Sequence, residues 1–259
     1  MSTSSTIPIL CTFDDSGVIA NNGRWGARYG PQTILNQLQK LNFAPKTGQF
    51  SKIESLPDKA EQLIHLGAGH NDLFPIMDHW LKNSSKKRLL INLDPHTDSR
   101  VDEQIHSGTP IAKLCQLYSQ QLRVWQIGIE TFANSTQTLD NAEKLSQKIS
   151  WRHQWQANET QLRKWIQEET NEMDFDHVFI SVDADVLSSA HMEAVSAVSY
   201  HGVGFELLRN TIQSCYQVFG QKVSLGIYEY NPLYENLSCK GAKQMALLCY
   251  DYLINCKQT

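Results

Sequence analysis

The chain has 259 residues, a formal net charge of −4 and a hydrophobic fraction of 41%, which are ordinary values for a globular protein. This length suits one large α/β domain over residues 1–259 better than two small domains. The net charge gives no reason to expect a nucleic-acid partner, and no apolar run approaches the ~20 residues that span a bilayer. Six scattered cysteines without a Cys-x-x-Cys pair, and a short polar N-terminus, predict a cytoplasmic protein with free thiols.

Strands and helices are predicted to alternate along the chain. Compact apolar runs predict strands that are buried on both faces, and segments with helical spacing of apolar residues predict helices. The elements expected in chain order are a strand at 7–13, helices at 31–41 and 72–81, a strand at 87–93, a helix at 109–121, a strand at 122–129, helices at 137–147 and 161–169, a strand at 177–183, a helix at 205–219, a strand at 223–228 and a helix at 239–254. This alternation predicts a mostly parallel sheet with helices on both faces, in which ligands bind beyond the carboxyl ends of the strands.

Acidic clusters follow two of these strands. Asp94-Pro95-His96-Thr97-Asp98 ends the first, and Asp183-Ala184-Asp185 ends the second. Alternate residues of an extended chain point the same way, and charges at the edge of an apolar core are costly unless they are paired or bound to metal. Helix caps and turns are the alternative explanation for either cluster alone. Two such strand ends in one chain favour a metal site.

The ligand types indicate which metal is expected. Four carboxylates and one or two imidazoles, without a thiolate, form an oxygen-rich site that favours Mn²⁺ or another octahedral divalent ion over structural zinc. Two such ions can share carboxylates and activate a bridging hydroxide near neutral pH. His70 follows a Gly-Ala-Gly turn after a short strand-like segment. A structural histidine is the alternative there, although small residues allow the backbone to approach a site closely.

Five motifs occur in a fixed order along nearly the whole chain. They are Gly17-Val18 through Asn22-Gly23-Arg24-Trp25-Gly26-Ala27 to Gly30-Pro31, Gly67-Ala68-Gly69-His70, the cluster 94–98, Ser181-Val182-Asp183-Ala184-Asp185-Val186-Leu187, and Glu229-Tyr230-Asn231-Pro232. In this order they resemble the ureohydrolases, the family of arginases, agmatinases and formiminoglutamases, and they look most like the formiminoglutamases. The resemblance implies a three-layer α/β/α arginase-like fold with about eight strands, two Mn²⁺ ions and a homo-oligomer.

The resemblance also implies roles for individual residues. One metal would be held by His70, Asp94, Asp98 and Asp183, and the other by His96, Asp94, Asp183 and Asp185, so that Asp94 and Asp183 bridge the two ions. Asp98 would also act in catalysis. Glu229 would accept hydrogen bonds from the cationic amidine or guanidine of the substrate; a surface acid after a strand is its alternative.

Two residues near the first cluster bear on the substrate. Ser107, in Ser107-Gly108-Thr109-Pro110, stands where agmatinases and arginases usually have a histidine, and Arg100 resembles the Asp-x-Arg of formiminoglutamases. An arginine there suits a substrate carboxylate and would repel the ammonium tail of agmatine; a surface ion pair is its alternative. His106 could take the role of the missing histidine or simply face solvent. Several positions depart from the family pattern, namely Asn71, Pro95, Ser188-Ser189, Glu193-Ala194 and Glu235.

These residues predict a hydrolase that cleaves a C–N bond of a linear amidine. The first hypothesis is hydrolysis of N-formimino-L-glutamate to glutamate and formamide, as in histidine degradation, through attack by a metal-bridging hydroxide. The second is a guanidine hydrolase that releases urea from agmatine, arginine or a guanidino acid. A non-catalytic metal-binding regulatory protein is the alternative from another class.

Overall fold

The computed structural model describes residues 6–43, 50–58, 62–82, 84–155, 164, 166–168 and 174–256. Its centre is an eight-stranded sheet of order β2-β1-β3-β8-β7-β4-β5-β6, in which all the neighbouring strands are parallel. The strands are β1 (Ile7–Cys11), β2 (Phe50–Ile53), β3 (Ile64–Leu66), β4 (Arg88–Leu93), β5 (Leu122–Ile129), β6 (Lys148–Trp151), β7 (His177–Asp183) and β8 (Val223–Tyr228). The predicted α/β class and parallel sheet are confirmed.

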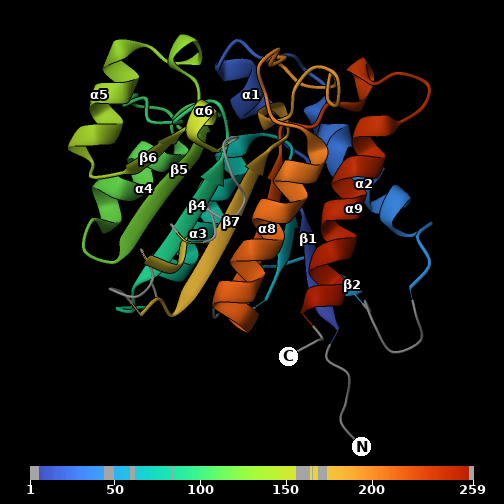
Figure 1. The fold of residues 1–259 in the computed structure, drawn as a ribbon, viewed down its shortest axis with the longest axis horizontal. Coiled ribbons are helices and arrows are strands. Elements are labelled where there is room, and N and C mark those ends of the chain that lie inside the picture. Colours follow the sequence, from blue (N-terminus) through green and yellow to red (C-terminus); the bar gives the residue numbers. More distant parts are fainter. Residues whose placement is uncertain are drawn as a thin grey trace, which may run out of the picture.

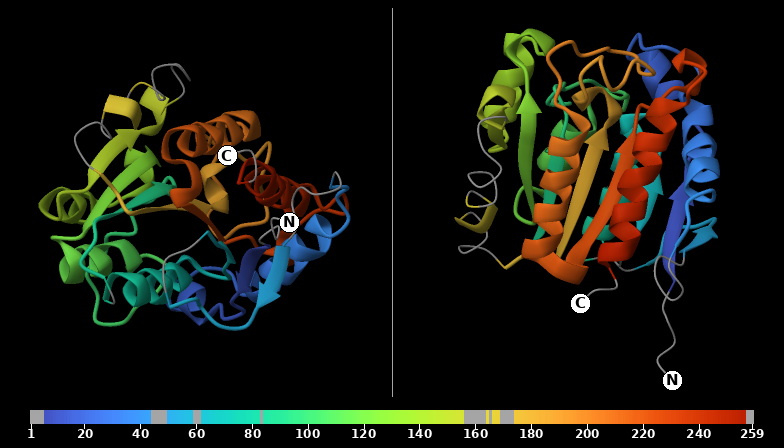
Figure 2. Two further views of the ribbon diagram at one scale, coloured as in Figure 1. Left: turned by 90° about the horizontal axis from the view of Figure 1, so that it is seen from below. Right: turned by 45° about the vertical axis from the view of Figure 1, so that its right-hand side comes forward.

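Helices cover both faces of the sheet (Figures 1 and 2). The helices described are α1 (Ser16–Ala20), α2 (Gly30–Leu38), α3 (Leu73–Lys82), α4 (Pro110–Tyr118), α5 (Thr136–Lys144), α6 (Arg152–Trp155), α8 (Phe205–Phe219) and α9 (Lys240–Asn255). One buried apolar cluster joins α2, α8 and α9 to one face of the sheet, whereas a second joins α3 and α4 to the other. Successive residues of β4 divide between the two, because Leu89 and Ile91 belong to the first cluster and Leu90 to the second. The result is three layers, α/β/α.

Local sequence explains where several helices begin and end. Pro31 and Pro110 stand in the first turns of α2 and α4, where the missing N–H costs nothing. The Ser135 hydroxyl caps α5 by accepting a hydrogen bond from the Thr138 N–H. At the other end of α5, Ser146 adopts a φ of 56° and closes a Schellman turn. The helix therefore ends at Lys144, three residues before the predicted 147.

The expected elements differ from the observed ones mainly at the edges of the sheet. Strands 122–129, 177–183 and 223–228 and helix 205–219 have the predicted bounds, and most others shift by one to three residues. The strands β2 and β6 and the helices α1 and α6 were not predicted from the sequence, and β3 was predicted only as a strand-like segment. The helix expected at 161–169 falls largely outside the described residues. No helix among the described residues is long and apolar enough to cross a membrane.

Strand order explains how distant parts of the chain meet. The central strands β3, β8, β7 and β4 are neighbours in the sheet, although β3 and β8 are separated by more than half of the chain. Because these strands are parallel, their carboxyl ends lie at one edge. Every acid and histidine singled out by the sequence as a candidate metal ligand follows or ends one of these strands.

Candidate metal centre

The two acidic clusters adopt the same local turn at the ends of β4 and β7. Asp94 Oδ1 accepts a hydrogen bond from the His96 N–H at 2.7 Å, and Asp183 Oδ1 accepts one from the Asp185 N–H at 3.0 Å. In both cases the aspartate bonds to the backbone two residues on, which is a turn favoured by this side chain. The turn interpretation and the ligand interpretation are thus compatible, because the second oxygen of each carboxylate, Oδ2, faces the Nδ1 atom of His70.

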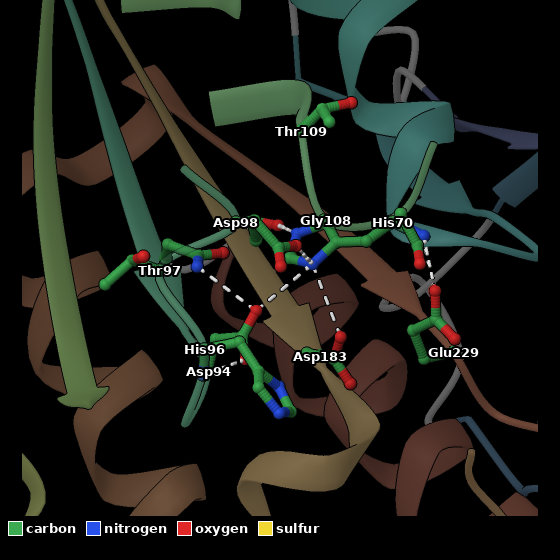
Figure 3. A network of polar contacts seen from close by, with 12 residues as sticks. His70, Asp94, His96, Thr97, Asp98, Gly108, Thr109, Asp183 and Glu229 are labelled. Carbon is green, nitrogen blue, oxygen red and sulfur yellow. Dashed lines mark hydrogen bonds and ion pairs between the residues drawn. The ribbon is translucent and has the colours of Figure 1, made fainter. Parts of the chain in front are cut away.

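His70 lies among three carboxylates. Its Nδ1 atom is 2.8 Å from Asp98 Oδ2, 3.2 Å from Asp94 Oδ2 and 3.3 Å from Asp183 Oδ2. Figure 3 shows His70 and Asp183 directed toward Asp98, with Asp94 and Asp98 both on the segment that follows β4. The opposite ring nitrogen, Nε2, is 2.7 Å from the buried Ser181 hydroxyl of β7. That contact fixes the orientation of the ring and keeps Nδ1 directed at the carboxylates.

A second group of possible ligands adjoins the first. His96 Nδ1 lies 3.2 Å from Asp94 Oδ1 and 3.4 Å from Asp185 Oδ2. The ligand atoms of His70, Asp94 and Asp98 lie within 4.8 Å of one another, and so do those of Asp94, His96 and Asp185. Asp94 belongs to both groups, as a bridging ligand should. Asp183 contacts His70 without belonging to either group.

Buried polar atoms that form no hydrogen bond indicate whether cations would fit between the two ligand groups. His70 Nδ1, Asp98 Oδ2 and Asp185 Oδ1 are buried and form no hydrogen bond, although charged groups surround them. Burying such atoms without a partner is costly. A divalent ion would coordinate them, and two ions would offset the four aspartate charges of the pocket. The donor set therefore fits two oxygen-preferring cations such as Mn²⁺.

The pKa values of these side chains reflect the close approach of so many buried charges. Burial raises the pKa of Asp98 to about 6, and the charge of Asp94 adds to this effect. Burial, reinforced by Asp183, likewise raises the pKa of Asp185 well above its usual range. Burial disfavours a charged His96, but Asp94 outweighs it and raises the pKa of that imidazole to about 9. A divalent cation would take the place of these protons.

Asp98 and Glu229 both adopt left-handed backbone conformations, with φ values of 46° and 63°. Non-glycine residues rarely adopt such values, and strain of this kind tends to occur at functional sites. Glu229 follows β8, and its Oε1 accepts a hydrogen bond from the His70 N–H at 2.9 Å. Burial raises the pKa of Glu229 well above its usual range, and the charge of Asp183 adds to the effect. Its carboxylate also lines the cavity beside the two ligand groups.

Behind His70 lies a fully bonded buried network. The ring of Tyr228 stacks on the His70 ring at a centroid distance of 5.0 Å, and its hydroxyl lies 2.9 Å from His65 Nδ1. A Cβ atom on Gly67 would come within 2.5 Å of the Tyr228 ring, so this close approach requires glycine. His65 Nε2 contacts the Thr12 hydroxyl at 3.1 Å, and that hydroxyl donates to Asp72 at 2.6 Å. His65 thus supports the centre from behind.

A polar cavity of about 260 Å³ opens onto the ligand groups. Its lining combines acids and His96 with amides, hydroxyls and the Arg100 guanidinium. Arg100 donates a hydrogen bond to the side-chain oxygen of Asn21, and the Asn21 amide donates to the Ser107 hydroxyl at 2.9 Å. The structure therefore brings Arg100, Ser107 and Glu229 to one cavity.

The positions of three residues, one buried histidine and two asparagines, were not predicted from the motifs. His106 is buried and is not among the described residues that line the cavity. Its ring lies 2.8 Å from Asp102 and accepts a hydrogen bond from the Gly108 N–H, so the solvent-facing alternative is wrong. Asn21 and Asn134 do line the cavity but were missed, because Asn21-Asn22-Gly23 signals only a turn and Asn134 belongs to no motif.

The candidate ligands form two adjoining groups at the carboxyl ends of a parallel sheet, where folds of this class bind their ligands. The arginase family model matches residues 49–254, so the chain belongs to the arginase family. The prediction of an arginase-family hydrolase is thereby confirmed.

Individual relatives show which members of the family this chain resembles. The formimidoylglutamase of Chromobacterium violaceum is 29% identical over 91% of this chain and 83% of its own length. Formimidoylglutamase from Bacillus subtilis superposes with a TM-score of 0.83 at 16% identity, over all of this chain and 89% of its own. Formiminoglutamase from Trypanosoma cruzi, crystallised with Mn²⁺, gives a TM-score of 0.79 at 18% identity, over 97% of this chain and 93% of its own. The predicted arginase-like fold is confirmed.

Proposed function

We propose that this protein hydrolyses N-formimino-L-glutamate to glutamate and formamide, with two Mn²⁺ ions as cofactors. The observation that carries the proposal is that one cavity is lined both by acids, at the ligand groups and Glu229, and by the exposed Arg100 together with Ser107. A substrate with a cationic amidine at one end and carboxylates at the other matches that lining. The named relatives support the same substrate class.

The residues that would hold the ions are those of the two ligand groups together with Asp183. His70, Asp94 and Asp98 would hold one ion, and Asp94, His96 and Asp185 the other. When bound, the two ions supply a nucleophile from water near neutral pH and offset negative charge that develops during the reaction.

Two acids would act on the reacting groups. Glu229 would accept hydrogen bonds from the amidine N–H groups, and the bond from the His70 N–H holds its carboxylate in place while it does so. Asp98 would orient the attacking water and accept its proton; His70 Nδ1, 2.8 Å from Asp98 Oδ2, holds this carboxylate at the cavity.

Arg100 would select the tail of the substrate. Its guanidinium lies at the cavity, where it can pair with a carboxylate. Arg100 donates a hydrogen bond to the side-chain oxygen of Asn21, and the Asn21 amide in turn donates to the Ser107 hydroxyl. The ammonium tail of agmatine would meet a like charge at this position. Arg100 therefore favours an acidic substrate over agmatine.

The experiment is a substrate panel with Mn²⁺-loaded protein. N-formimino-L-glutamate, agmatine and arginine are compared by release of formamide, glutamate and urea. We expect kcat/KM to be highest for formiminoglutamate, and Arg100→Gln to raise KM for it by about tenfold, the size of one charge-assisted contact, with kcat less affected. Lys113→Gln, on α4, is the matched loss of a positive charge and should change neither constant. Urea from agmatine or arginine without turnover of formiminoglutamate would favour the guanidine-hydrolase alternative instead.

A further inference from the structure

Three buried amide side chains form a connected row beside the metal centre. Asn92 on β4 and Gln126 on β5 are paired in the sheet register, and the Asn92 Nδ2 donates to Gln126 Oε1 at 3.0 Å. Gln126 Nε2 in turn donates to Gln147 Oε1 at 2.8 Å. All three side chains are buried, and amides are rarely buried unless hydrogen bonds hold them. None of the roles proposed above uses them.

Both ends of this row reach the loop that carries three of the candidate ligands. At one end, Asn92 Nδ2 also lies 3.3 Å from Asp94 Oδ2. In the middle of the row, Gln126 Nε2 donates to the Thr97 carbonyl at 2.7 Å, and at the other end Gln147 hydrogen bonds with the Ser99 hydroxyl. The row therefore spans loop 94–99 from its first residue to its last.

Two further amides complete the hold on this loop. Asn134 accepts from the Thr97 N–H at 2.9 Å and donates to the Pro95 carbonyl at 2.8 Å. Asn141 on α5 donates to the Ser99 carbonyl at 3.0 Å. Side-chain amides thus supply hydrogen bonds that a strand or helix would otherwise supply.

The conformation of Asp98 explains why such support is needed. Its φ of 46° is an uncommon value for a residue with a side chain, and it persists only where the surroundings enforce it. The backbone on both sides of Asp98 is held, because Thr97 and Ser99 are the residues that Gln126, Asn134 and Asn141 bind. A relaxed loop would carry the Asp98 carboxylate away from His70.

We propose that Gln126, together with Gln147, is a positioning residue for the metal centre. Through this row of amides it sets the place of Asp94 and Asp98, and so the affinity for the ions, without touching substrate. The inference rests on the proposed function, since it presupposes that the aspartates bind metal. Outer-sphere contacts of this kind typically change metal affinity by ~10–100-fold when they are removed.

The test compares Mn²⁺ affinity with the stability of the metal-free protein. Gln126→Met removes the central amide at similar volume, and Gln147→Leu is the milder variant at the end of the row. Val124→Ala is the matched control, because Val124 is buried two residues earlier on the same strand and touches none of the amides by hydrogen bond. The measurements are Mn²⁺ titration after chelation, and the unfolding temperature in EDTA.

We expect Gln126→Met to weaken Mn²⁺ binding by ~10–100-fold and Gln147→Leu by about tenfold. Val124→Ala should keep wild-type affinity within about twofold even where it lowers the unfolding temperature as much. If Gln126→Met fails to fold, Gln147→Leu decides the question. If the folded glutamine variants keep the Mn²⁺ affinity of the wild type and lose only stability in EDTA, the positioning role is wrong, while the proposed function is unaffected. Failure of the wild-type protein to bind Mn²⁺ would contradict the proposed function as well.

Discussion

The buried His177 allows a quantitative prediction about pH and stability. It begins β7, its Nε2 lies 2.9 Å from the Ser224 hydroxyl, and Trp80 packs edge-on against its ring. Burial lowers its pKa from 6.5 to about 3, and the charge of Arg88 contributes. Six residues of extended chain, ~20 Å, separate it from Asp183, so it titrates far from the metal centre.

Whether the free energy of unfolding rises or falls with pH depends on which state, folded or unfolded, binds the proton. Between pH 6.5 and pH 3 the unfolded chain carries a proton on His177 that the folded chain does not. The free energy of unfolding therefore falls as the pH falls through this window, by up to ~1.4 kcal/mol per pH unit. Between pH 7 and pH 5 the loss due to this one residue is about 2 kcal/mol.

Urea unfolding in EDTA at pH 7 and pH 5 measures this loss. His177→Gln retains an amide that can reach Ser224 but cannot titrate, so the stability of the variant relative to wild type should rise by about 2 kcal/mol on going from pH 7 to pH 5. His153→Gln is the control, because His153 is exposed on α6. A difference between wild type and His177→Gln that is the same at both pH values would refute the reasoning.

Two further predictions concern the centre itself. Asp185→Asn should lower the Mn²⁺ content to about one ion per chain, since the group of His70, Asp94 and Asp98 stays intact. Asp94→Asn should lower it below one ion, because Asp94 belongs to both groups. Elemental analysis measures both contents, and equal contents in the two variants would contradict the shared role of Asp94. Tyr228→Phe should cost about 1–3 kcal/mol of stability by leaving His65 Nδ1 without its donor, with Mn²⁺ affinity unchanged. Tyr228→Leu should also weaken Mn²⁺ binding, because it removes the ring stacked on His70; identical Mn²⁺ affinities in the two Tyr228 variants would argue against a supporting role for the ring.

The central strands could be predicted from sequence because both of their faces are buried. β4, β7 and β8 are mostly apolar and fully buried, and a candidate ligand or Glu229 ends or directly follows each of them. The edge strands β2 and β6 carry lysine and are only partly buried, so no apolar run marks them. β3 is only three residues long and includes the polar His65, so its sequence does not read as an apolar run either.

The candidate ligands were also visible in the sequence, because aspartates at the ends of apolar strands need a reason to be there. Gln126 and Gln147 offered no such signal. Their neighbourhood depends on the β4–β5 register and on the turn at Ser146, where serine stands in place of the glycine that usually ends a helix in this way. Asn21 was hidden likewise, because only folding brings it to Arg100.

The separation of strand ends from loops in this cavity has an evolutionary consequence. The candidate ligands lie at the ends of the central strands or within five residues of them, whereas Asn21, Arg100 and Ser107 lie farther along the chain from those strand ends, in segments that contribute little to the core. Substitutions in those segments leave the apolar runs of β4, β7 and β8 unaffected. A lineage with this fold can therefore exchange one amidine for another through a few loop changes, while the hydrolytic chemistry is inherited intact.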